Sequence, residues 1–198
     1  MEIIVFFALA GAAWVFARAR QQQRRIALLG SFLSRYTIEK NIETVTQGYL
    51  RALGEADAGR QAQVLDLLRA NEQALCSQVA QLAKDFAAAQ PVITAVSKLP
   101  VWVPLAPSLA GSFDLREALR IHARGICRAV DVPPETSPRD RAFAISAELL
   151  LMQHTCHWFC RSRLVASSRM LARHRTSYEQ LVASVLPQTR AEYLALVA

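Results

Sequence analysis

The sequence predicts an all-α protein, with a short N-terminal transmembrane helix followed by an antiparallel bundle of about four helices. Three observations predict this class. Glycine and proline are scarce, at 7 and 8 in 198 residues. β-branched residues form none of the alternating runs that half-buried strands require. Apolar residues instead recur at spacings of three and four, which is the period of a helix face.

We expect two regions. Residues 1–30 form a membrane anchor with a basic juxtamembrane segment, and residues 31–198 form one cytoplasmic helical domain. The anchor is the uncharged run Ile3 to Ala17, which is followed at once by Arg18, Arg20, Arg24 and Arg25. Positive charge on the C-terminal side of a span predicts that this side is cytoplasmic. The expected location is therefore the inner membrane, as a single-pass protein with a cytoplasmic body.

The apolar run has two other interpretations. Its helix would span only about 22 Å of a hydrocarbon core of about 30 Å, so it could be the core of a cleavable signal peptide, with Ala17 to Ala19 as the cleavage site. The sequence before it, Met1-Glu2, is acidic where a signal peptide is basic, and the arginines come after the run. The third interpretation is an ordinary helix that docks on a partner.

From Gln21 to about Leu53 the pattern predicts continued helix, with a bend at Gly30. One face of its second half is apolar and carries Ile38, Ile42, Val45, Tyr49 and Ala52. Glu39 and Glu43 project from another face and are expected to be solvated, because no Glu-x-x-His motif accompanies them as in di-metal bundles. Gly54 to Gly59 predicts a tight connection.

The segment Arg60 to Gln90 has the clearest helical pattern. Its three-four alternation has a single polar position, Glu72, and otherwise comprises Leu65, Leu68, Leu75, Val79, Leu82, Phe86 and Ala89. The stripe either packs inside the bundle or forms a coiled-coil seam with another chain. The second interpretation makes Leu65, Leu68, Leu75, Val79, Leu82 and Phe86 partner contacts in a homo- or hetero-oligomer.

Residues 91–111 form an apolar segment rich in proline, with Lys98 as its only charge and Trp102 at its centre. Four prolines exclude one regular helix. We expect the segment either to fold over the bundle as a hydrophobic lid or to lie against a membrane or partner, and internal packing is the commoner arrangement. Trp102 is the contact residue in the second case.

Ser112 is the expected N-cap of a helix that runs to about Val130. His122 lies on its apolar stripe and is expected to be a hydrogen-bonded core residue. The sequence DVPPETSP, residues 131–138, predicts a linker.

The segment Arg139 to Leu186 is expected to form one long helix, or two with a break near Ser167 and Ser168. Pro187 ends it, and a short helical tail follows.

Four residues that could ligate a metal or haem lie together in QHTCHWFC: His154, Cys156, His157 and Cys160. A membrane-bound redox protein is therefore one alternative function. On a continuous helix, however, the two histidines share one face and the two cysteines another, and no Cys-x-x-Cys pair occurs, so we expect no metal and no cofactor. All four cysteines of the chain, including Cys76 and Cys127, are expected to be reduced.

Lys and Arg outnumber Asp and Glu by 23 to 16, which favours an anionic partner. Acids are absent from residues 3–38 and 149–178. We expect these stretches to contact membrane lipids or an anionic surface through Arg18, Arg20, Arg24, Arg25, Arg161, Arg163, Arg169, Arg173 and Arg175. A basic module for an acidic protein or nucleic acid is an alternative, and the absence of a nucleic-acid motif disfavours nucleic acid.

No catalytic motif occurs, so the sequence favours a non-enzymatic role. The hypothesis that best accounts for a short anchor, an apolar Trp/Pro segment, a heptad helix and the lack of a catalytic motif is an accessory or scaffold subunit of a bacterial membrane assembly. Its partners would be lipids and other subunits of that assembly.

Overall fold

A computed structural model describes residues 1–103, 111–131 and 136–198. The all-α class is confirmed. The elements are α1 (Glu2–Leu33), α2 (Ile38–Leu53), α3 (Ala58–Phe86), α4 (Pro91–Thr94), β1 (Ala95–Ser97), β2 (Ser112–Asp114), α6 (Leu115–Val130), α7 (Pro138–Cys160), α8 (Arg163–His174), α9 (Tyr178–Ser184) and α10 (Pro187–Val197).

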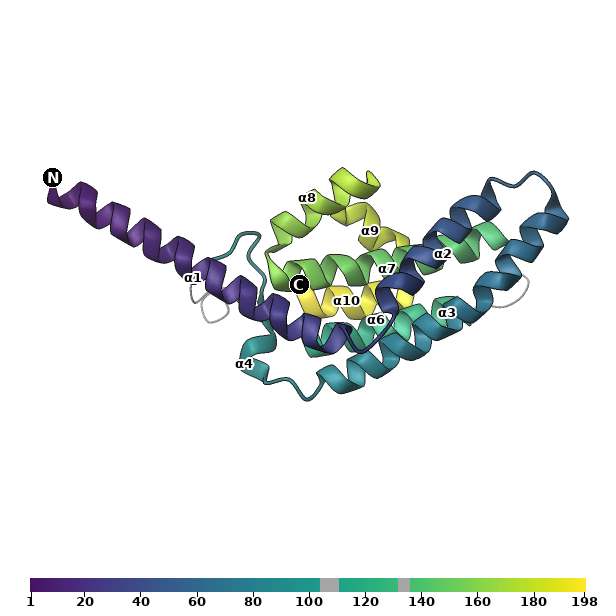
Figure 1. The fold of residues 1–198 in the computed structure, drawn as a ribbon, viewed down its shortest axis with the longest axis horizontal. Coiled ribbons are helices and arrows are strands. Elements are labelled where there is room, and N and C mark those ends of the chain that lie inside the picture. Colours follow the sequence, from purple (N-terminus) through teal and green to yellow (C-terminus); the bar gives the residue numbers. More distant parts are fainter. Residues whose placement is uncertain (104–110, 132–135) are drawn as a thin grey trace.

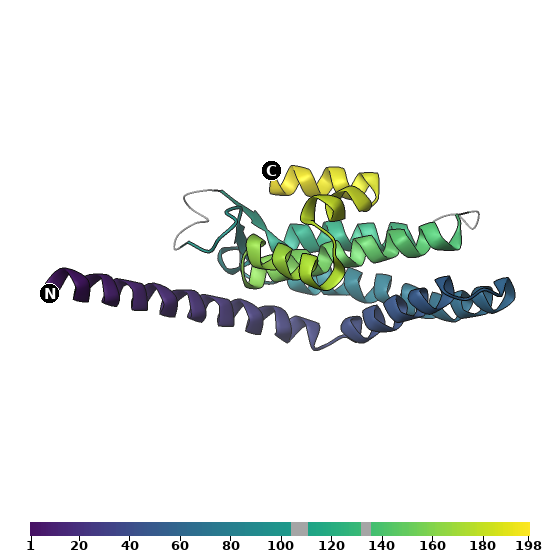
Figure 2. The ribbon, with the colours of Figure 1, turned by 90° about the horizontal axis from the view of Figure 1, so that it is seen from above.

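Helix α1 projects from the body along its first half and packs against it along its second (Figures 1 and 2). The bend expected at Gly30 does not occur, because α1 continues to Leu33 and the chain turns only at Ser34–Thr37. Gly30 is exposed and no neighbouring side chain crowds it, so nothing there forces the helix to bend. Leu29 already belongs to the core, and α1 therefore joins the two regions as one continuous rod.

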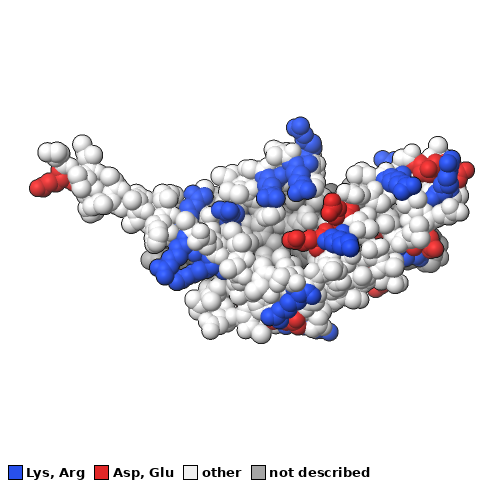
Figure 3. Space-filling view, in the orientation of Figure 1, with Lys and Arg blue, Asp and Glu red and all other residues white. Residues whose placement is uncertain are grey.

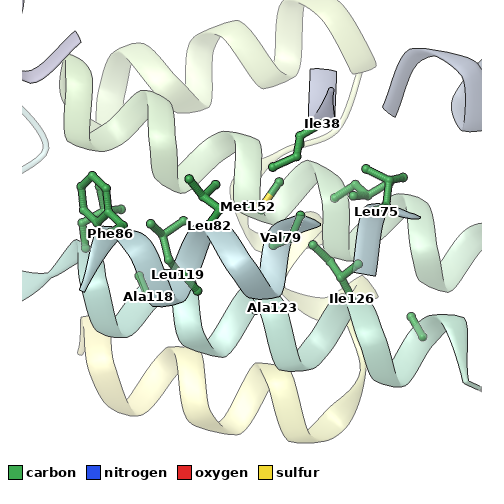
Figure 4. Close-up of a cluster of buried hydrophobic side chains, with 14 of the residues drawn as sticks. Ile38, Leu75, Val79, Leu82, Phe86, Ala118, Leu119, Ala123, Ile126 and Met152 are labelled. Atoms are coloured by element: carbon green, nitrogen blue, oxygen red, sulfur yellow. The ribbon is translucent and has the colours of Figure 1, made fainter. Parts of the chain in front are cut away.

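The core lies between α3, α6 and α7, with α2 against α3. Figure 4 shows Leu75, Val79, Leu82 and Phe86 of α3 in one cluster with Leu119 and Ile126 of α6 and Met152 of α7. The alternative of a coiled-coil seam with another chain is therefore wrong for this stripe. The body itself buries Leu68, Leu75, Val79, Leu82 and Phe86, and half-buried Leu65 packs at the edge.

Glu72, the polar position in that stripe, is buried among three helices. Tyr49 of α2 donates a hydrogen bond to its Oε1 at 2.5 Å, and Arg141 of α7 forms an ion pair with its Oε2. A charge inside a core requires such partners. Glu72 therefore connects α2, α3 and α7 at a position where the pattern alone would place leucine.

The C-terminal segment breaks earlier than expected. Helix α7 ends at Cys160, and Ser162 caps α8 by accepting a hydrogen bond from the amide of Val165. Ser167 and Ser168, the expected break, lie inside α8. Arg175 then adopts a left-handed conformation, and Ser177 and Gln180 form a capping box that starts α9. Pro187 begins α10, because the first helical position needs no amide donor.

The segment after α3 contains a two-stranded antiparallel sheet that pairs Val96 of β1 with Phe113 of β2. Ser112 is part of β2 and not the N-cap. Asp114 caps α6 instead, accepting from the amide of Arg116. Residues 104–110 of the apolar segment and 132–135 of the expected linker lie outside the described residues.

A disulfide joins Cys76 of α3 to Cys127 of α6. The expectation of four reduced cysteines is wrong for this pair. The two residues are 51 positions apart in the sequence, and the packing of α3 against α6 brings their Cα atoms to 4.8 Å. Cys156 and Cys160 are free thiols.

A buried carboxyl group lies where the C-terminal helices meet the bundle. Glu148 of α7 accepts a hydrogen bond from the amide of Leu186 at 3.0 Å, and its Oε2 lies over Gly125 of α6 beside the hydroxyl of Thr189. Within the described residues, Oε2 has no hydrogen-bond partner. Burial raises the pKa of Glu148 from 4.5 to about 7, although the Leu186 amide, Thr189 and, more distantly, Arg128 oppose the shift and Glu192 reinforces it.

This pKa predicts that the contribution of Glu148 to stability falls as the pH rises. Because folded Glu148 keeps its proton up to about pH 7 and the unfolded chain loses it near 4.5, this contribution to the free energy of unfolding should drop by about 3 kcal/mol across that window. Burial lowers the pKa values of His122 and His154 to about 3 and about 4, which changes stability in the opposite direction. The contribution of Glu148 is therefore measured as the difference between the wild type and Glu148→Gln in urea unfolding at pH 5 and pH 8. The exposed Glu43→Gln is the control and should keep the wild-type slope. If the free energy of unfolding changes equally with pH in the wild type and both variants, the raised pKa of Glu148 is refuted.

Candidate membrane-facing surface

The first half of α1 is an exposed apolar rod. Every side chain from Ile3 to Ala17 is exposed, and none of the helix's most apolar 18-residue window is buried. With 32 residues, α1 is about 48 Å long, so length and composition allow it to cross a membrane. A core helix of a soluble protein would bury such a window. Exposed apolar surface of this extent requires lipid or another protein to cover it.

The second half of α1 is held on the body by a buried face that contains Gln22, Arg25 and Leu29. Arg25 donates to the carbonyl oxygens of Phe159 at 3.0 Å and Ala95 at 2.6 Å, and its guanidinium stacks on the ring of Phe159. The expectation that Arg25 contacts lipid is therefore wrong. Burial lowers the pKa of Arg25, and its hydrogen bonds hold α1 on the body. Arg25 lies three residues after Gln22 and four before Leu29, and this spacing places the three residues on one helix face.

Trp102 marks the boundary between the two halves of α1. Its indole nitrogen donates to Oε1 of Gln21 at 2.6 Å, and its ring meets that of Trp14 edge to face at 5.8 Å. The guanidinium carbon of Arg18 lies over the ring of Trp14, 5.8 Å from its centre. The described part of the apolar segment therefore packs beside α1 at the end of its apolar run. Two indoles at this level resemble the aromatic belt of membrane proteins.

The other arginines expected to contact the membrane fall into two groups, one along α1 and one around α8. Figure 3 shows Lys and Arg over the middle of α1 and over α8, and also at the far end of the body near α2 and α3. Arg20 and Arg24 are exposed, and Arg18 is half-buried. Around α8, Arg163 is half-buried over the ring of Trp158. The exposed members are Arg161, Arg169, Arg173 and Arg175. Arg161 links the two groups, because it donates to Oε1 of Gln22 on α1 at 2.7 Å.

The residues of QHTCHWFC do not converge. His154 is buried and hydrogen-bonded to Ser167 at 3.1 Å, while burial raises the pKa of Cys156 to about 12 and that of Cys160 to about 11. Thiolate is the form that binds metal. Across the described parts of the chain, no three His, Cys, Asp or Glu side chains gather as a metal site would need. His122 is a core residue as expected, bonded to Thr155 at 2.9 Å.

Fold and surface together define a class: a helical bundle that carries one exposed apolar helix long enough to cross a membrane. No family model, curated protein or solved structure matches the chain.

Proposed function

We propose that this protein is a membrane-anchored accessory or scaffold subunit of a bacterial membrane protein assembly, acting through protein and anionic-lipid contacts. The observation that carries the proposal is the exposed apolar half of α1, which continues without a break into a half docked on the body. A rigid connection of this kind fixes the body at the bilayer, and an anchored body meets membrane partners at a raised effective concentration.

The heptad stripe of α3 is buried inside the body, so it is not the surface that binds a partner. The exposed small and apolar residues of α1 are the surface that best fits a partner helix. Short spans pack closely through small side chains, and the run contains Ala8, Gly11 and Ala12. Trp102 is half-buried against α1, so its remaining face is directed to the same level of the membrane.

We propose an inner-membrane location with the body in the cytoplasm, because Arg18, Arg20 and Arg24 follow the apolar run. The disulfide between Cys76 and Cys127 favours the opposite side, since disulfides persist in oxidising compartments. A membrane-impermeant maleimide applied to intact cells distinguishes these arrangements when the label target is an exposed cysteine at Leu67→Cys. Protection before lysis supports the cytoplasmic body, and labelling of intact cells contradicts it.

Alkaline carbonate extraction of membranes tests the anchor. The wild-type chain should stay in the pellet, and Ala8→Lys with Ala12→Lys should release it, because each charge near the centre of a span costs about 3 kcal/mol. Ala27→Lys is the matched control, exposed on the docked half of the same helix, and should stay with the membrane. Release of the wild type would contradict the anchor. An intact mass that lacks residues 1–19 would instead identify a cleaved leader.

Purification in mild detergent, followed by identification of the proteins that co-purify, tests the subunit role. We expect other membrane proteins in stoichiometric amount, and their loss when Ala8 and Ala12 are changed to lysine. A lone monomer from wild-type membranes would contradict the role while leaving the anchor intact.

A further inference from the structure

Helix α8 carries an unusual outer face. It rests on the bundle through Ala166 and Met170, the two buried residues of the helix. Three large apolar side chains point outward instead: Leu164 is 54% exposed, Val165 39% and Leu171 53%. On an ordinary protein surface, exposed apolar side chains are scattered singly, whereas α8 carries three within eight residues.

The side of α8 next to this face is basic. No acid occurs in residues 149–178, and Arg161, Arg169 and Arg173 are exposed. Val165, Arg169 and Arg173 follow one another at intervals of four residues, so the two arginines line a flank of the helix, on the side away from Leu164 and Leu171. Cations in the last turn, such as Arg173, also stabilise the helix dipole. Arg161 precedes the helix and Arg169 lies in its middle, so the dipole does not explain them. Apolar side chains flanked by arginine are the composition of a helix that lies in an anionic membrane interface.

Helix α8 begins close to the end of the apolar run of α1. The amide of Leu164 donates to the carbonyl of Pro100 at 2.9 Å, two residues before Trp102. Arg161 reaches Gln22, one turn of α1 beyond Arg18. The first turn of α8 therefore adjoins the place where α1 changes from apolar to basic. Figure 1 shows α8 in the half of the body from which the free part of α1 departs.

We propose that the apolar outer face of α8, with Leu164, Val165 and Leu171, inserts shallowly into an anionic bilayer, that the flanking Arg161, Arg169 and Arg173 contact its head groups, and that this contact holds the body against the membrane surface. The proposal rests on the anchoring role of α1 and adds a second contact to it. Charge complementarity and continuity with the anchor select lipid as the occupant. With two contacts, the orientation of the body on the membrane is fixed, as a scaffold requires.

A fluorescent probe on the full chain tests this contact. An NBD group on Leu171→Cys should brighten several-fold on vesicles that contain phosphatidylglycerol, and much less on phosphatidylcholine alone. The control is Leu67→Cys, 77% exposed in the first half of α3, which should stay dim on both. Figure 1 shows the N-terminal end of α3 at the end of the body opposite the free part of α1. Selective labelling is feasible at neutral pH, because burial raises the pKa of both free thiols, Cys156 and Cys160, to about 12 and 11.

Flotation of the same samples separates the two proposals. A dim probe on protein that floats with the vesicles overturns the α8 contact and leaves the anchor standing, and an acidic protein would then be the partner of this face. Protein that fails to float overturns the anchor itself. Arg169→Glu with Arg173→Glu should abolish the brightening without affecting flotation. Persistent brightening in that variant, or equal brightening on neutral vesicles, overturns the choice of anionic lipid.

Discussion

Replacing Cys76 and Cys127 together with serine should lower the free energy of unfolding of the oxidised protein by about 4 kcal/mol. The disulfide closes a loop of 51 residues, and in the chain-entropy model a cross-link of this length removes that much entropy from the unfolded state. The effect is large against the roughly 5–15 kcal/mol that stabilises a domain. Urea unfolding in detergent, followed by circular dichroism, measures it.

Reductant provides the control. Dithiothreitol should destabilise the wild type to the level of the double variant and leave the double variant unchanged. Equal stability of wild type and variant under oxidising conditions would contradict a formed disulfide.

The oxidation state of Cys76 and Cys127 in cells gives a second measurement of the side of the membrane on which the body lies. If the body is cytoplasmic, rapid acid quenching and alkylation should find Cys76 and Cys127 reduced, because that compartment keeps thiols reduced.

Regular packing was predictable because it follows from local periodicity. The apolar faces of α2 and α3 were identified from spacings of three and four, and most of their predicted members are buried. Ile42 and Leu65 are half-buried, and Asn41 is buried on α2 although the pattern did not include it. The buried His122 followed from the same pattern on α6. Tertiary pairs were not predictable. Cys76 and Cys127 are 51 residues apart, and no sequence motif near either cysteine indicates which residue it pairs with.

Residues with two plausible environments account for the remaining errors. Arg25 stands beside exposed Arg24, and charge alone assigned both to the membrane surface. Its position on the same face as Leu29 decides its burial, and the carbonyls that receive it come from Phe159 and Ala95. Ser162 caps α8, which has apolar residues on its exposed side as well as its buried side, so hydrophobic periodicity does not reveal the break after Cys160.

Glu72 shows that a single polar position in an apolar stripe can mark a long-range contact in the core. Its partner Arg141 is 69 residues away, and Tyr49 is 23 residues away. Arg141→Met should lower the free energy of unfolding by about 3–5 kcal/mol, because the carboxylate of Glu72 would then be an uncompensated buried charge. The exposed Arg139→Met, two residues earlier on α7, should change stability by less than about 0.5 kcal/mol.

Making the site wholly apolar should restore most of the loss. Glu72→Leu with Tyr49→Phe and Arg141→Met places leucine in the heptad position and leaves no polar atom of the three without a partner. Buried ion pairs are often replaced by packed apolar residues at little or no cost. Urea unfolding of the single and triple variants gives the comparison. A triple variant as unstable as Arg141→Met would mean that the ion pair, and not the desolvated charge left behind, stabilises the junction of α2, α3 and α7.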